Sequence, residues 1–327
     1  MRLRRSDPAK PGYGRRRQGR GVVFLDLAGR PIRDADEVAR LRALAIPPAW
    51  RDVWISPHPG GHIQATGTDA AGRRQYLYHP LWRVRRDQAK FDHVLTVATR
   101  LPVLRDRIDA DLATRGLCRE RVLATVAKLL DMGTFRIGGD QYAAGDDPTY
   151  GVATLRPEHV RTRRGLVVFE FPAKGGVAQL RQVDDADLRG VLRDLRRSRR
   201  DADRLFGYRD GRIWRDVRSD EINCYLREAS GTDMTAKDFR TWHATVLAAT
   251  RLAASEPQRS ATGRRRTVAA AMREVAELLG NTPTVARASY VDPRVVDLYH
   301  DGVVAAAGPD APRRVAEGAV LDLLGRS

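Results

Sequence analysis

The strongest constraint on the fold is a change in hydrophobic periodicity near residue 88. Before it, short runs rich in β-branched and aromatic residues, VWIS, HIQATG and RQYLYH, are separated by Gly-containing turns. After it, apolar residues recur at helical spacing, as in RERVLATVAKLLDMG, where Val122, Val126 and Leu129 share one face. We therefore predict an α+β protein. It has a small β-rich N-terminal domain over residues 21–88 and a larger, mainly α-helical domain over residues 89–327.

Three segments stand apart from this pattern. Residues 1–20 are basic and lack an apolar stretch, which predicts a flexible basic arm. Within the helical domain, residues 165–183 carry two β-type runs around a Pro-Ala-Lys-Gly-Gly turn, which predicts a β-hairpin with Lys174 at its tip. The tail after about residue 303 ends in a short helical pattern. The sequence leaves open whether this tail packs on the helical domain or binds a partner.

The charge balance points to a polyanionic partner. Lys and Arg total 58 against 41 Asp and Glu, a formal net charge of +17, and nucleic acid is the first candidate. Only five of the basic residues are Lys, so the chain strongly prefers Arg, but that preference does not explain the excess over acidic residues. The two cysteines have no zinc-ligand or disulfide spacing. No signal-peptide pattern or apolar run of about 18 residues is present, so we expect a cytoplasmic protein without a membrane partner.

Two arginines stand in sequence contexts that call for an anion. Arg136 lies between apolar residues just after a strong helical pattern, and Arg240 lies in the first turns of an otherwise apolar helix. A guanidinium on an apolar face needs a negatively charged partner. For Arg136 that partner is either a nearby carboxylate, Asp131 or Asp140, or a phosphate.

A lysine, an amide and a tyrosine complete a set suited to phosphodiester transesterification. A tyrosine hydroxyl such as that of Tyr290 has a pKa of about 10 and is a weak nucleophile at neutral pH. Two guanidiniums can hold the non-bridging oxygens during its attack, and Lys174 can release a proton to the leaving 5′ oxygen. Asn281 adds a side-chain amide nine residues before the tyrosine. This chemistry needs no metal, and no P-loop or two-metal acidic cluster is present, so no cofactor is expected.

The order and spacing of these residues resemble the type IB DNA topoisomerases, specifically their bacterial and poxvirus-like branch. The matching motifs are Arg136 in FRIG, Lys174 in PAKGG, Arg240 in KDFRT, Asn281 in GNTP and Tyr290 in RASY. The resemblance implies that these five residues are catalytic, with Tyr290 as the nucleophile. Asn281 stands where the poxvirus enzymes have His, so we expect it to position and polarise the phosphate without acid–base work.

The resemblance also implies where DNA binds and what the reaction achieves. The matching DNA-contact positions are Arg73, Gln75, Tyr76, Tyr78, Tyr142 and Lys237. We expect a monomeric, nucleoid-associated enzyme that clamps double-stranded DNA. It would relax positive and negative supercoils through a transient 3′-phosphotyrosyl link, without ATP. Two alternatives are a tyrosine recombinase or integrase and a non-catalytic DNA-binding protein. Recombinases usually carry His where this chain has Lys237.

Overall fold

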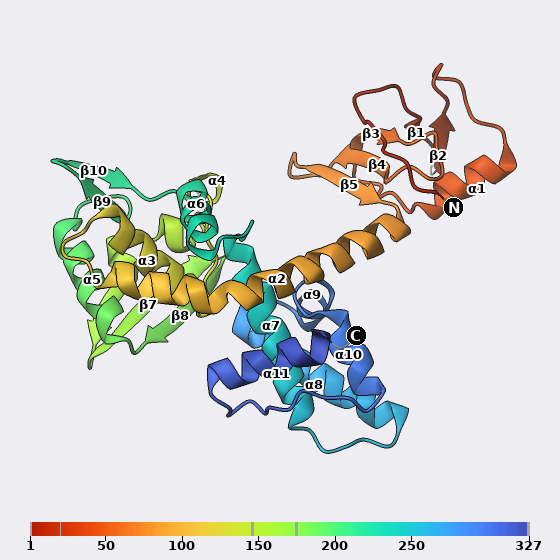
Figure 1. The fold of residues 1–327 in the computed structure, drawn as a ribbon. Helices are drawn as coiled ribbons and strands as arrows, with labels where there is room; N and C mark the ends of the chain where they lie inside the picture. Colours follow the sequence, from red (N-terminus) through yellow and green to blue (C-terminus); the bar gives the residue numbers. More distant parts are fainter. Residues whose placement is uncertain (1, 20, 145–146, 174–175, 326–327) are drawn as a thin grey trace. The chain divides into compact units, whose positions relative to one another are not determined.

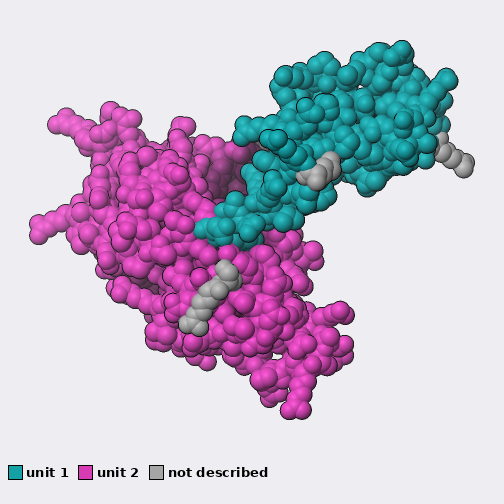
Figure 2. Space-filling view, turned by 45° about the vertical axis from the view of Figure 1, so that its right-hand side comes forward, with its two compact units in different colours: residues 1–92 teal, residues 93–327 magenta. Residues whose placement is uncertain are grey.

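The computed structural model describes residues 2–19, 21–144, 147–173 and 176–325. The chain divides into two compact units, residues 1–92 and residues 93–327, shown in two colours in Figure 2. Each unit has a hydrophobic core of its own. The division falls inside the long helix α2 (Pro80–Leu112), four residues after the boundary predicted at residue 88. The predicted α+β class, with a β-rich part followed by a helical part, is confirmed.

The N-terminal unit contains two small antiparallel sheets and one helix. Its elements are β1 (Gly14–Gln18), β2 (Gly21–Leu25), α1 (Ala35–Ala43), β3 (Arg51–Ile55), β4 (Ile63–Thr68) and β5 (Arg74–Tyr78). β1 pairs with β2, and the three strands predicted from the sequence form the sheet β3-β4-β5. Phe24, Leu41, Ile55 and Ala65 form the buried core between these elements. Each strand is too short to bury much surface alone, so the sheets depend on this shared core.

The predicted flexible arm is instead an ordered part of this unit. Residues 14–18 form β1, and Tyr13 pairs with Ile55 of β3 through backbone hydrogen bonds of 2.8 Å in both directions. The Trp54 indole Nε1 also donates to the Lys10 carbonyl at 2.9 Å. The backbone groups of Arg4 also pair with Gly60 and His62, in the segment between β3 and β4. Composition reports side-chain polarity and carries no information about such pairing.

The second unit is built around one central helix. Its helices are α3 (Arg119–Leu130), α4 (Asp140–Ala143), α5 (Ala186–Ser198), α6 (Ser219–Ser230), α7 (Ala236–Ala253), α8 (Ala261–Leu279), α9 (Pro283–Ser289), α10 (Pro293–His300) and α11 (Arg313–Gly325), with short 3-10 turns at Val152–Thr154 and Pro157–His159. α7 contacts α3, α6, α8, α10 and α11 (Figure 1). It buries residues on all sides, including Phe239, Trp242 and Leu252, as expected for a helix enclosed by neighbours. A capping box between Thr235 and Asp238 begins it.

A three-stranded antiparallel sheet packs among these helices. Its strands are β6 (Val160–Arg163), β7 (Leu166–Ala173) and β8 (Val177–Val183), in the order β6-β7-β8. The pairing of β7 with β8 confirms the predicted hairpin, while Lys174 and Gly175 at its tip lie outside the described residues. A second hairpin, β9 (Gly207–Asp210) with β10 (Ile213–Asp216), was missed by the sequence reading. Its strands are four residues long, at the lower limit of the length over which alternation is readable.

The C-terminal tail belongs to the core of the second unit. Helix α11 lies against α7, as Figure 1 shows. It buries Ala316, Val320, Leu323 and Leu324. This packing answers the question that the sequence left open. Within the described part of the chain, no helix combines the length and hydropathy needed to span a membrane.

A candidate catalytic cavity in the helical unit

An open cavity of about 830 Å³ lies where β8, α8 and α9 meet the loop between α3 and α4. Three of the five predicted catalytic residues, Arg136, Asn281 and Tyr290, line it. The cavity is also lined by Val177 of β8 and Arg273 of α8. We call this hollow the Tyr290 cavity. Residues separated by more than 150 positions in the sequence thus face one space.

A helix end and a short helix place the amide and the tyrosine. α8 stops at Gly280, whose φ of 61° is left-handed and suits a residue without a side chain. The Thr282 hydroxyl then caps α9, which has Pro283 at its first position and Tyr290 as its C-cap residue. Seven helical residues therefore separate the two predicted catalytic positions. The spacing of Asn281 and Tyr290 is set by local structure.

Arg136 binds the end of α8 directly. Its Nη2 donates to the carbonyl oxygens of Leu279 and Gly280, both at 3.2 Å, and to Asn281 Oδ1 at 3.0 Å. The C-terminal carbonyls of a helix lack partners within the helix and carry partial negative charge, so a guanidinium stabilises them. The same contacts orient the Asn281 amide. Because arginine only donates, the amide oxygen faces Arg136 and the amide nitrogen is left for another acceptor.

Arg240 lies against the predicted nucleophile. Its side chain is buried, and its Nη2 donates to the Leu279 carbonyl at 2.8 Å, while Nη1 reaches the Gly133 carbonyl at 3.4 Å. Its guanidinium carbon lies 5.4 Å from the centre of the Tyr290 ring, a cation–π distance. Tyr290 is thus held beside a cation. Both arginines are anchored to the end of α8 through Leu279.

Neither arginine has a carboxylate partner among the described residues. The two carboxylates proposed as alternatives for Arg136 are engaged elsewhere: Asp140 pairs with Arg204 at 2.9 Å, and Asp131 belongs to a separate network. Burial lowers the pKa of Arg136. Burial, reinforced by the charge of Arg136, lowers the pKa of Arg240 to about 10. Two desolvated cations side by side create a strong preference for an anion.

The helical unit also contains a fully paired cluster of charged residues that sequence reasoning missed. Asp131, at the C-cap of α3, accepts from Arg105 Nε at 2.8 Å and from Arg313 Nη2 at 2.5 Å, and its Oδ1 lies 3.3 Å from His243 Nε2. Arg105 also donates to both carboxylate oxygens of Glu317, at 2.7 and 2.8 Å. We call these five residues the Asp131 network. It joins α2, α3, α7 and α11 at the start of the loop that carries the first cavity arginine.

Comparisons with known proteins agree with this geometry. A family model described as "Eukaryotic DNA topoisomerase I, catalytic core" matches residues 79–302. The chain belongs to the type IB DNA topoisomerase family. A second model, "Bacterial DNA topoisomerase IB, N-terminal domain", matches residues 21–69. A relative named "DNA topoisomerase 1B" from Acanthamoeba polyphaga mimivirus is 27% identical over 300 residues, covering 89% of this chain and 88% of that protein. The resemblance drawn from the motifs is confirmed: the chain is a DNA topoisomerase, an enzyme whose substrate is DNA.

In the N-terminal unit of this topoisomerase, two predicted DNA-contact residues share one carboxylate. Asp69 accepts from Arg73 Nε at 3.0 Å and from Gln75 Nε2 at 2.8 Å. The backbone N–H of Arg73 contributes most to lowering the pKa of Asp69 to about 2. These contacts hold both side chains at the turn between β4 and β5 without DNA.

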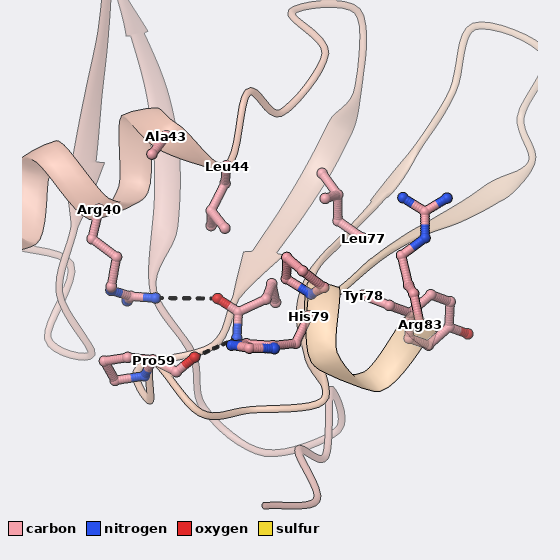
Figure 3. A pocket seen from close by; sticks show the side chains of 10 residues that line it. Arg40, Ala43, Leu44, Pro59, Leu77, Tyr78, His79 and Arg83 are labelled. Carbon is pink, nitrogen blue, oxygen red and sulfur yellow. Dashed lines mark hydrogen bonds between the residues drawn. The ribbon is translucent and has the colours of Figure 1, made fainter. Parts of the chain in front are cut away.

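The two predicted DNA-contact tyrosines of β5 lie together. The rings of Tyr76 and Tyr78 are stacked, with centroids 6.0 Å apart, and Tyr76 is 46% exposed. Tyr78 and Arg83 line a cavity of about 590 Å³, and Figure 3 shows Arg83 beside that tyrosine. On the opposite wall, Arg40 donates to Gln64 Oε1 at 3.5 Å. Arg83 follows in the first turns of α2 and was not singled out from the sequence.

The remaining predicted positions differ in what the structure shows of them. Tyr142 on α4 is 62% exposed, and Lys237 is exposed in the first turn of α7. Lys174, the predicted general acid, lies outside the described residues. The structure thus brings four predicted catalytic residues to one place: Arg136, Arg240, Asn281 and Tyr290. In the described ranges, no group of three or more His, Cys, Asp or Glu side chains is placed to hold a metal ion.

Proposed function

We propose that this topoisomerase relaxes positive and negative supercoils by cutting and resealing one strand of duplex DNA. The Tyr290 hydroxyl attacks a phosphodiester, forms a 3′-phosphotyrosyl link and frees a 5′ hydroxyl. The observation that carries this proposal is the cavity itself. Two desolvated arginines without a counter-ion in the described structure lie beside one tyrosine. The scissile phosphate is the anion that such a site would accept.

The cationic residues of the Tyr290 cavity fit the charge that develops in this reaction. Attack on phosphorus adds negative charge to the non-bridging oxygens, and Arg136 and Arg240 supply charge and paired donors for them. Because Arg136 holds Asn281 Oδ1, the Asn281 amide nitrogen is free to donate to the same phosphate. That nitrogen is buried and lacks a partner among the described residues. Its orphaned state in the free enzyme is explained if a phosphate oxygen fills the position.

The proton balance follows from the groups involved. Tyr290 loses its hydroxyl proton as the new O–P bond forms, and the departing 5′ oxygen gains one as the old bond breaks. We assign the second transfer to Lys174, because lysine can release a proton whereas arginine effectively cannot. Resealing reverses both transfers. The phosphotyrosyl bond keeps the phosphodiester's energy, so we propose that no ATP, metal or other cofactor takes part.

The proposed setting of the enzyme follows from its charge. A net charge of +17 suits a protein held on DNA mainly by phosphate contacts, so we propose that activity falls steeply with salt. We further propose that it acts as a monomer on nucleoid DNA in the cytoplasm. Light scattering of the enzyme with and without a duplex tests the first part, because a dimer in either state contradicts it.

Relaxation of supercoiled plasmid in EDTA without ATP tests the main proposal. Wild type should relax plasmids of either sign, and Tyr290→Phe should relax neither, because it lacks the nucleophilic oxygen. Tyr299→Phe is the matched control. It removes a buried hydroxyl of α10 that has no partner in the described structure, so activity should persist. A requirement for a divalent metal, or a covalent adduct on the 5′ end of the cut, would disprove the proposal.

A further inference from the structure

A further arginine that the motifs do not include lies near Arg136 and Arg240, the two motif arginines beside Tyr290. Arg181 is on β8, the strand whose Val177 lines the cavity. Along β8, Gln179, Arg181 and Val183 alternate onto the less exposed face, while the residues between them are exposed. Val183 is part of the hydrophobic core. Arg181 therefore lies on the inward-facing side of β8, four residues along the strand from Val177.

The contacts of Arg181 link it to the end of α8. Its Nη2 donates to Gln179 Oε1 at 2.6 Å. The Gln179 amide lies 3.5 Å from the position that a Cβ at Gly280 would occupy. Gly280 is also the residue whose carbonyl accepts from Arg136. One short chain of contacts thus places Arg181 beside the segment that both cavity arginines bind.

Arg181 also lacks a counter-ion within the described part of the chain. Its Nε is buried there without any hydrogen-bond partner. Burial, and then the charge of Arg136, lowers the pKa of Arg181, and the charge of Arg181 adds to the lowering at Arg240. Three guanidiniums therefore act on one another, and none of them has a carboxylate partner among the described residues. A cluster of this kind loses free energy to desolvation and repulsion until an anion enters.

Other arginines of the same region show what a structural role looks like. Arg161 on β6 pairs with Glu170 of β7 at 2.6 Å, and Arg189 on α5 pairs with Asp184 at 3.1 Å. Each has a carboxylate across the strand or one turn away. Among the described residues, Arg181 has only a neutral amide and a carbonyl as acceptors. Its position is suited to a ligand's charge and poorly suited to holding the sheet together.

We propose that Arg181 is a further phosphate-binding residue of the catalytic site, acting with Arg136 and Arg240. Its guanidinium binds either the scissile phosphodiester or the phosphate next to it on the same strand. This inference rests on the proposed function. The tyrosine, the two motif arginines and the amide retain the roles given above.

Single-turnover cleavage of a duplex carrying a site mapped with the wild-type enzyme tests the proposal. Arg181→Met removes the charge and keeps the length of the side chain, and cleavage should slow about 100-fold, as for loss of one transition-state donor. Arg181→Lys should recover part of the rate. Arg163→Met is the matched control: it removes one charge from an exposed position on β6 of the same sheet and should cleave like wild type.

Two further measurements separate phosphate binding from a structural role. A duplex with a neutral methylphosphonate at the phosphate that Arg181 contacts should abolish the difference between wild type and Arg181→Met. Placing that group at the cleavage site in one duplex and at the adjacent phosphate in another identifies which phosphate is bound. Without DNA, Arg181→Met should melt at or above the wild-type Tm, because it removes an unpaired desolvated cation.

The outcomes are distinct. If Arg181→Met cleaves like Arg163→Met, the inference is wrong while the proposed function stands. If its lower activity comes with a lower Tm, and both methylphosphonate duplexes leave the defect intact, Arg181 is structural and the inference is again wrong. If the wild-type enzyme itself does not relax DNA, the proposed function has failed, and Arg181→Met plays no part in that result.

Discussion

Two groups of arginines in the helical unit are similarly buried but differ in their partners. In the Tyr290 cavity, Arg136 and Arg240 donate to backbone carbonyls and one amide. In the Asp131 network, Arg105 donates to two carboxylates, those of Asp131 and Glu317. The network satisfies its charges internally, whereas Arg136 and Arg240 have no carboxylate partner among the described residues, although the exposed Glu277 also lines the cavity. The presence or absence of a carboxylate partner thus distinguishes an arginine that stabilises the fold from an arginine suited to bind an anionic ligand.

The pKa directions of the two groups express the same contrast. Burial works against the charge of Arg105, but the hydrogen bonds that it donates to Glu317 and Asp131 outweigh burial and raise its pKa. Burial acts on Arg240 too, and there the neighbouring charge of Arg136 reinforces it, so its pKa falls to about 10. At neutral pH Arg240 is still protonated. The free enzyme therefore keeps an unfavourable interaction that a bound phosphate would relieve.

The largest effect is expected from Arg240→Met in the cavity. Loss of a charged donor that acts on the transition state should slow single-turnover DNA cleavage by about 1,000-fold. Because removal of an unpaired desolvated cation offsets the hydrogen bonds lost to the Leu279 and Gly133 carbonyls, the free energy of unfolding should change by less than about 1 kcal/mol. Cleavage kinetics and chemical denaturation measure the two quantities. A large loss of stability would show that Arg240 belongs with the structural arginines.

The opposite pattern is expected from Arg105→Met in the network. Removing this side chain leaves Asp131 and Glu317 buried with fewer donors, which should lower the free energy of unfolding by about 3 to 5 kcal/mol. At a temperature where the variant remains folded, its cleavage rate should stay far closer to wild type than that of Arg240→Met. Denaturant titration and cleavage assays at low temperature decide this. A variant that is stable but inactive would contradict the division of roles.

A smaller effect is expected at acidic pH, where protonation of the carboxylates of the Asp131 network should lower the free energy of unfolding. Burial alone would raise the pKa of Asp131, but hydrogen bonds from His243 and Arg105 hold it well below its usual range; hydrogen bonding from Arg105 likewise lowers the pKa of Glu317. Their stabilisation is present above the unfolded pKa values of about 4 and is lost as pH falls through and below them.

Comparison of wild type with Glu317→Gln tests that acid sensitivity. The variant lacks one of the two titrating carboxylates, so its free energy of unfolding should fall less between pH 5 and pH 3 than that of wild type. Urea denaturation at each pH measures the slope. Equal slopes for the two proteins would remove Glu317 from the acid-sensitive group. Arg181→Met, which leaves the network intact, should show the wild-type slope.

The cavity was largely readable from the sequence because its chemistry is carried by residue types at fixed local spacings. The end of α8 is indicated by Gly280, and the start of α9 is indicated by Thr282 and Pro283. These two signals set the separation of Asn281 and Tyr290 in the sequence. The need of Arg136 for an anion was also visible. The sequence did not decide between carboxylate and phosphate, because that depends on where distant acidic side chains point.

The Asp131 network was not readable for a related reason. Its members come from positions 105, 131, 243, 313 and 317, and only the pair Arg313 and Glu317 has a local spacing, i to i+4. Arg181 escaped notice because one arginine in a polar strand resembles any solvated residue. In both cases the informative quantity is the presence or absence of a partner from another element, which only tertiary structure supplies.

The smallest expected effect tests the contrast with a simple anion instead of DNA. Sulfate should bind between the cavity arginines and stabilise the enzyme, by about 1.4 kcal/mol at ten times its Kd.

Sulfate also stabilises proteins generally by exclusion from their surfaces. The specific part is therefore the increase in Tm of wild type over that of Arg240→Met in sulfate, each measured against chloride at equal ionic strength. Arg163→Met should keep the full wild-type increase, because its arginine is exposed and is not one of the cavity-lining residues. Identical increases in all three proteins would mean that the cavity does not attract anions in the free enzyme. The arginines would then acquire their affinity only when DNA assembles the rest of the site.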